Sequence, residues 1–136
     1  METYSTQDET TLYAILAVYG FIFVLLLIAG LCHIITKWVI FKKAGQPGWG
    51  ILVPFYNIYL MQIIAFPKEK WPFVFLLLLP GVNAVYGIYL QYSFARSYGL
   101  STGGSIAYLF FSPIMNFYLA FSGQVTYQGT QDFFIK

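Results

Sequence analysis

The residues with the clearest chemical pattern are the three asparagines, because each of them stands three positions after a proline. The pairs are Pro54 and Asn57, Pro80 and Asn83, and Pro113 and Asn116. A proline inside a helix lacks an N–H and leaves the carbonyl four residues earlier without its donor. In hydrocarbon that carbonyl needs another partner, and an asparagine amide one turn later can supply one across a helix interface. The pattern favours kinked helices that are joined by hydrogen bonds between their polar side chains. The alternative is a functional one: a small polar chamber in the middle of the membrane that binds a solute, as in transporters.

The spacing also predicts a shared depth for the three asparagines. At about 1.5 Å per helical residue, Asn57 lies roughly 12 Å inside from Trp49, and Asn116 lies roughly 19 Å from Gly103. Asn83 enters from the opposite face and lies roughly 18 Å from Trp71. In a hydrocarbon core about 30 Å thick, all three would sit near one level in the middle.

Side chains that carry catalysis are scarce in this sequence. Between Thr10 and Thr130 the only acidic residue is Glu69, so the paired carboxylates of many hydrolases and ion-coupled carriers are missing. The single histidine, His33, adjoins the single cysteine, Cys32, and two such residues are too few for a metal site. No P-loop, HExxH or GxSxG motif occurs. We therefore predict no enzymatic activity, no metal and no cofactor.

The elements that must position these residues are long apolar stretches. Of the 136 residues, 59% are hydrophobic and 9% are charged, which leaves no polar face for a soluble domain. Uncharged blocks run over residues 12–35, 49–66, 71–95 and about 103–123. A membrane-crossing helix needs about 20 such residues. The sequence predicts an all-α integral membrane bundle of four transmembrane helices, the last three kinked at proline, with a re-entrant second block as the alternative.

The predicted domain organisation is a polar N-terminal tail over residues 1–11, a transmembrane domain over 12–128 and a C-terminal tail over 129–136. The N-terminal segment has no basic region, so it does not resemble a cleavable signal peptide. If all four blocks span, one side carries Lys37, Lys42, Lys43 and Arg96, and the other carries Lys68 and Lys70. The positive-inside rule then predicts both termini outside the cytoplasm.

A short basic and glycine-rich connector joins the first two blocks. It contains Lys43, Gly45, Pro47, Gly48 and Trp49. Proline followed by glycine is the residue order of a type II turn, in which the glycine takes a positive φ angle. We expect a tight cytoplasmic turn with Trp49 at the membrane interface, although lysines here could also contact lipid headgroups or a partner.

Several motifs in order give the chain a resemblance to a known family. They are Lys43-Ala-Gly-Gln-Pro-Gly-Trp49, Val53-Pro-Phe-Tyr-Asn-Ile58, Leu79-Pro-Gly-Val-Asn83 and Phe94-Ala-Arg-Ser-Tyr-Gly99. Over roughly residues 35–128 the chain resembles a small bacterial membrane domain of unknown function. That domain also precedes the catalytic region of some signal peptidase I proteins. The resemblance implies a location in the bacterial cytoplasmic (inner) membrane, and it supplies no catalytic residue.

These observations favour a non-enzymatic accessory or scaffold subunit of a larger membrane complex. Aromatic residues make up 21% of the chain, which suits packing against lipid or against another membrane protein. The alternative is a small channel or carrier, acting as a homo-oligomer, whose polar site is the asparagine level. A weaker third possibility is an immunity or regulatory protein for one membrane enzyme. The net charge of +2 is too small to indicate a nucleic-acid partner.

Overall fold

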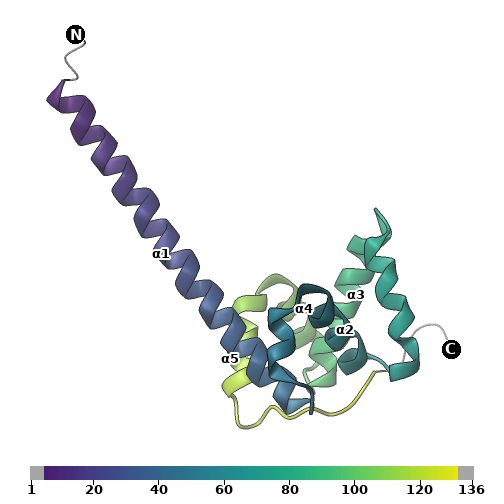
Figure 1. Cartoon of the computed structure of the whole chain (residues 1–136). Coiled ribbons are helices and arrows are strands. Elements are labelled where there is room, and N and C mark those ends of the chain that lie inside the picture. The colour runs from purple at the N-terminus through teal and green to yellow at the C-terminus, as the bar shows by residue number, and fades with distance from the viewer. Residues whose placement is uncertain (1–4, 132–136) are drawn as a thin grey trace. The chain divides into compact units, whose positions relative to one another are not determined.

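The computed structural model describes residues 5–131, and this part of the chain contains helices and no strand. The elements, shown in Figure 1, are α1 (Thr6–Lys43), the 3₁₀ helix η1 (Gly48–Leu52), α2 (Pro54–Ala65), the 3₁₀ helix η2 (Lys68–Leu78), α3 (Val82–Ser97), α4 (Thr102–Phe110) and α5 (Ser112–Phe121). The prediction of an all-helical chain is confirmed for the described residues. The ends of both predicted tails, residues 1–4 and 132–136, lie outside them.

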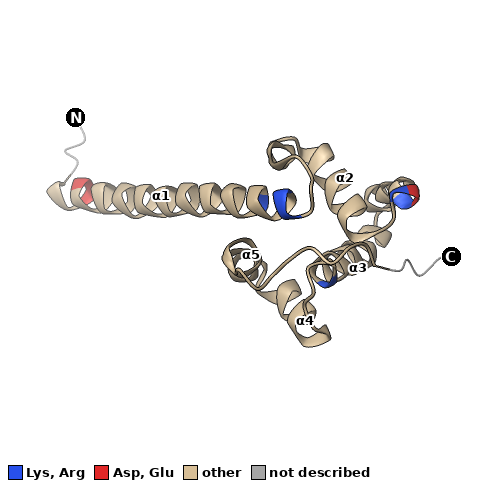
Figure 2. Ribbon diagram, turned by 90° about the horizontal axis from the view of Figure 1, so that it is seen from below, with Lys and Arg blue, Asp and Glu red and all other residues tan. Residues whose placement is uncertain are grey.

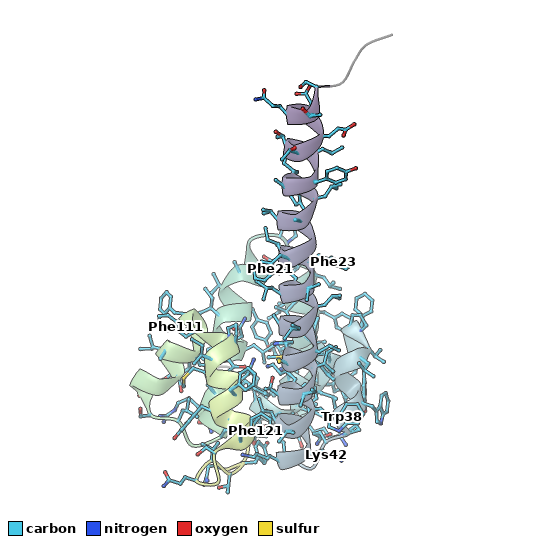
Figure 3. All side chains as sticks on the ribbon, turned by 90° about the vertical axis from the view of Figure 1, so that its left-hand side faces the viewer. Phe21, Phe23, Trp38, Lys42, Phe111 and Phe121 are labelled. Carbon is cyan, nitrogen blue, oxygen red and sulfur yellow. The ribbon has the colours of Figure 1, made fainter. Side chains whose placement is uncertain are left out.

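The chain divides into two compact units after Cys32, and the first unit is the N-terminal part of α1. Of the described residues, this helix alone is long and apolar enough to cross a membrane. Its acidic residues lie in the first turn and its lysines near the end, with no charge between, as Figure 2 shows. Side chains such as Phe21 and Phe23 project from it on different sides in Figure 3, and both are exposed. A helix that is apolar all round suits a lipid environment.

The second unit begins at His33 and contains the buried core. Ile40 and Phe41 from the end of α1 are fully buried together with side chains of α2, α3, α4 and α5. The core members from those helices include Leu60, Ile64, Leu90, Phe94, Tyr108 and Leu119. The Phe41 and Phe94 rings meet edge to face, with their centroids 6.4 Å apart. Apolar burial and aromatic packing thus hold five helices around one core.

The second, third and fourth predicted spans are each divided into two helical segments. Residues 49–66 form most of η1 and all of α2, residues 71–95 fall in η2 and α3, and residues 103–123 fall in α4 and α5. The prediction of continuous helices kinked at proline is therefore wrong for these blocks. The structure has helix breaks where kinks were expected.

The three prolines lie where helices begin, which explains the breaks. Pro54 and Pro113 are in the first turn of α2 and α5, where a missing N–H leaves no helical carbonyl without its donor. Pro80 lies just before α3. The residue before the proline then accepts from the asparagine: Asn57 N–H donates to the Val53 carbonyl at 2.8 Å, and Asn83 N–H to the Leu79 carbonyl at 2.9 Å. Proline followed by asparagine at this spacing is therefore a helix-start pattern in this chain.

The connector after α1 also differs from the prediction, because its positive φ angle belongs to Gly45 and not to Gly48. Gly45 N–H donates to the Lys42 carbonyl at 3.0 Å, and Gln46 N–H donates to the Phe41 carbonyl at 2.9 Å. These two bonds with a left-handed glycine form a Schellman motif, which ends α1. Gly48 begins η1 instead, and the expected type II turn is replaced by this helix cap.

The segment after α5 runs back across the second unit and is bonded to it. Gln128 N–H donates to the Ser97 carbonyl and Gln131 N–H donates to the Ala65 carbonyl, both at 2.7 Å. The Tyr127 hydroxyl donates to the Ile64 carbonyl at 2.7 Å. Burial raises the pKa of Tyr127, which keeps this hydroxyl a neutral donor. Residues 129–131 of the predicted C-terminal tail therefore include a point of attachment to the helical unit.

Candidate functional site

A polar pocket of about 270 Å³ lies within the second unit, and all five α-helices contribute to it. Its lining consists of His33, Lys37, Asn57, Met61, Gln91, Tyr108, Ser112 and Asn116. Most of these side chains can donate or accept a hydrogen bond, in a chain that is mainly apolar. Polar groups that converge in a concave site are the usual feature of a ligand pocket.

Lys37 supplies the positive charge of the pocket. Its side chain is only 6% exposed, and its Nζ atom donates to the Tyr108 hydroxyl at 3.0 Å. The same atom lies 4.5 Å from the centroid of the Phe94 ring, close enough for a cation–π contact. No carboxylate belongs to the lining that the described residues form. The ammonium is therefore stabilised by a phenol and an aromatic face, without a counter-charge on that lining.

A chain of hydrogen bonds runs from Lys37 to Asn116. The Tyr108 hydroxyl accepts from Lys37 and donates to Asn116 Oδ1 at 2.9 Å, while the Ser112 hydroxyl donates to the Tyr108 carbonyl at 2.6 Å. Because Asn116 Oδ1 is the acceptor, its Nδ2 is left as a donor. Within residues 5–131, neither Asn116 Nδ2 nor Asn57 Oδ1 has a hydrogen-bond partner, and both atoms are buried.

The three asparagines of the sequence pattern do not all meet. Asn57 and Asn116 line the same pocket, and Asn116 is 1% exposed. Asn83 is exposed and is not part of the lining. The prolines that precede them, Pro54, Pro80 and Pro113, are exposed and lie in the first turn of a helix or just before it. The pattern therefore brings two amides together, and its third copy serves only as a helix start among the described contacts.

The connector residues do not contribute to the pocket, and their contacts are with α1, α2, α5 and the segment after α5. Lys43 donates from Nζ to the carbonyls of Leu119, Ser122 and Val125, at 2.7, 3.0 and 3.1 Å. Gly48 is buried against Trp38, and a Cβ at this position would lie 2.4 Å from Trp38 Cδ1. Trp49 is exposed and stacks on Tyr56 with ring centroids 5.1 Å apart. Pro47 immediately precedes η1.

An apolar groove of about 490 Å³ forms a second concave surface on this unit. Residues of α2 and η2 line it: Phe55, Ile58, Tyr59, Trp71, Val74, Phe75, Leu77 and Leu78. A row of rings runs into it, in which Trp49 stacks on Tyr56 and Tyr56 stacks on Tyr59. Trp71 then meets both Tyr59 and Phe75 edge to face. The groove presents aromatic faces with almost no polar group.

Lys37 and Tyr108 were not identified as site residues from the sequence. In the sequence, Lys37 was only one of the basic residues that set the predicted orientation, and Tyr108 was one of twelve tyrosines. The two are 71 residues apart, so no local spacing could have paired them. Gln91 lines the pocket, whereas Gln62 accepts from the buried Tyr86 hydroxyl at 2.6 Å elsewhere in the core. Among the described residues, no group of three or more His, Cys, Asp or Glu could hold a metal ion.

The comparisons with known proteins identify the family without giving it an activity. The model of a family of unknown function (DUF5684) matches residues 49–130, which is more than half of the chain. The chain therefore belongs to this family. A search of curated proteins and a search of solved structures found no significant match. Of the pocket residues, His33 and Lys37 precede the matched region, and the other six lie inside it.

Proposed function

We propose that this member of a family of unknown function is a non-enzymatic protein of the bacterial cytoplasmic membrane, with four spans and both termini outside. In this proposal it is an accessory or scaffold subunit that docks on a larger membrane complex. The observation that carries the docking role is the aromatic groove between α2 and η2. The groove and the apolar α1 give the chain two surfaces that suit other apolar groups.

The partner that best fits the groove is an apolar helix of another membrane protein. The groove is lined by the large rings of Phe55, Tyr59, Trp71 and Phe75, and buried rings of this kind are common anchors of interfaces. The residues that line the groove carry no charged side chain, so a charged partner segment would find no opposite charge inside it. A helix rich in leucine or phenylalanine could instead fill the groove without burying an unpaired charge.

The test is affinity purification of the full chain from its native membrane in a mild detergent, followed by the mass and composition of the eluate. We expect a stoichiometric membrane subunit that is retained by the native chain and lost or reduced at least about tenfold in Phe75→Ala, since a buried ring contributes 2 kcal/mol or more at a hot spot. Phe110→Ala is the matched control, because Phe110 is 77% exposed and lies outside the groove. A clean homo-oligomer, or equal loss in both variants, would reject docking through the groove.

A second candidate function is a small channel or carrier, and the polar pocket with Asn57 and Asn116 is the observation that favours it. A four-helix protein of this size would have to oligomerise to enclose a pore. Reconstituted liposomes that show solute flux with the native chain, and no flux with Asn57→Leu or Asn116→Leu, would support it. Asn83→Leu is the control, because Asn83 lies outside the pocket. A native chain that is stable in liposomes but shows no solute flux would reject the channel or carrier and favour the accessory function.

A further inference from the structure

Lys37 places a buried positive charge in the polar pocket, and no described residue of the lining neutralises it. The side chain is more than nine-tenths buried, and the described hydrogen bonds use one of the three N–H groups of its ammonium. Burying an ammonium without an opposite charge is costly. The Phe94 ring and the Tyr108 hydroxyl offset part of that cost, and an anion in the pocket would offset the rest.

The two asparagine side-chain atoms without hydrogen-bond partners among the described residues indicate which other groups such an anion would have. Asn116 Nδ2 is a buried donor without a partner, so it can bind a second oxygen of the same anionic group. Asn57 Oδ1 is a buried acceptor without a partner, so it can accept from a hydroxyl or N–H on the ligand. Buried polar atoms are almost always hydrogen-bonded in native proteins, which makes two orphans in one pocket informative.

We propose that this pocket binds a small monoanionic oxygen group that carries a neighbouring hydroxyl. One lysine matches one negative charge, Asn116 matches the oxyanion and Asn57 matches the hydroxyl. The volume of about 270 Å³ limits the occupant to a small group. Such a group has two sources in a membrane: the phosphoglycerol head of an anionic lipid, or a free hydroxy acid. This site does not depend on the docking function proposed above.

Ordered water is the competing occupant, because a water chain could join Asn116 Nδ2 to Asn57 Oδ1. Water would satisfy both amides and leave the charge of Lys37 uncompensated. The two occupants therefore differ in one measurable property, which is a preference for an anion over an uncharged group of similar shape.

The test uses the full chain in a neutral detergent, with lipid and soluble probes in separate arms. Native mass spectrometry measures retention of phosphatidylglycerol against phosphatidylcholine, and calorimetry measures binding of lactate, a monoanion with a neighbouring hydroxyl, against uncharged glycerol. We expect at least one anionic probe to bind about tenfold or more tightly than its counterpart, because a hydrogen bond to a charged group has about that value. Preference in the lipid arm alone identifies a headgroup, and preference in the soluble arm identifies a free hydroxy acid.

Two lysine variants separate the pocket from general attraction to a basic surface. Lys37→Met should remove the preference for the anion, and Lys42→Met should keep it, because Lys42 is exposed and lies outside the lining. No anionic preference in the native chain would mean that water alone occupies the pocket. Equal loss in both variants would mean surface attraction. Either result would overturn the proposal.

The variant Asn116→Asp is a second test of anion binding, and it keeps Lys37 in place. The carboxylate has nearly the same shape, still accepts from Tyr108, and places a fixed negative charge in the pocket with Lys37. We expect this variant to lose anion binding at least about tenfold and to unfold at a higher temperature than the native chain. Asn83→Asp, at the exposed third copy of the pattern, should bind as the native chain does. Native-like anion binding by Asn116→Asp would contradict the proposal.

Discussion

Gly48 illustrates how a single residue can decide the packing of the connector after α1. A Cβ at this position would lie 2.4, 2.5 and 2.7 Å from three atoms of the Trp38 ring, distances at which something must shift. The indole is a rigid plane that contacts the glycine directly, so the clash has no flexible chain end to absorb it. We expect Gly48→Ala to lower the free energy of unfolding by about 1–3 kcal/mol, measured by denaturant titration in detergent.

Gly87→Ala is the control for this prediction, because the added Cβ would meet Leu77 Cδ2 at 3.6 Å, an ordinary contact. Gly87 lies inside α3, where alanine is favoured over glycine by up to about 1 kcal/mol. The control should therefore be neutral or stabilising. Equal stability of Gly48→Ala and the native chain would show that Trp38 can move away from the connector.

The sequence predicted part of the candidate site at the level of residues. Asn57 and Asn116 were singled out by their spacing from proline, and the structure places both in one pocket. Asn83 has the same spacing and is exposed, because the pattern encodes the start of a helix and not the direction its first turn faces. The burial of Lys37 could not be predicted, since it depends on Tyr108 and Phe94, which reach it only through the tertiary fold.

At the scale of elements, Lys43 connects the end of α1 to the end of α5. Its ammonium donates to three carbonyls at the end of α5 and just beyond it, where a helix no longer supplies N–H donors, and of the three the Ser122 carbonyl also accepts from Val125 N–H at 3.3 Å. Lys43→Met would leave these carbonyls with one donor fewer, so we expect a loss of about 1–3 kcal/mol in the free energy of unfolding. Lys42→Met should have little effect, because Lys42 is exposed. Similar unfolding midpoints for the two variants would contradict a capping role for Lys43.

The positions at which the helices break could not be predicted from composition. Hydropathy marks residues 49–66, 71–95 and 103–123 as continuous apolar blocks, and it does not respond to where a helix begins. The breaks follow from backbone geometry: Val53 is extended before Pro54, as a residue before proline prefers, and Gly81 takes a φ angle of 83° after Pro80. The prolines were visible in the sequence, and their role as helix starts in place of kinks needed the structure.

At the scale of the whole molecule, the lengths of the elements bear on how many times the chain crosses a membrane. α1, with 38 residues, is about 57 Å long, which exceeds a hydrocarbon core of about 30 Å. α3 is the longest α-helix among the described residues after α1, and its 16 residues give about 24 Å. Spans two to four would therefore each require two consecutive segments. In that arrangement, the carbonyls exposed at each break must be satisfied within the protein.

The four-span proposal predicts opposite sides for two exposed positions, Glu69 near the start of η2 and Thr102 at the start of α4. In a Cys32→Ala background, we expect Glu69→Cys to react with a membrane-impermeant maleimide in intact bacterial cells. Thr102→Cys should react only after the cells are permeabilised, because residues 71–95 would separate the two positions by one crossing. Thr6→Cys is the control for the outer side, and it should behave as Glu69→Cys does. Labelling of Glu69→Cys and Thr102→Cys from the same side would show that η2 and α3 together do not cross. The polar pocket would then belong to a unit that lies against one face of the membrane, where a lipid headgroup is the nearer of its two possible anions.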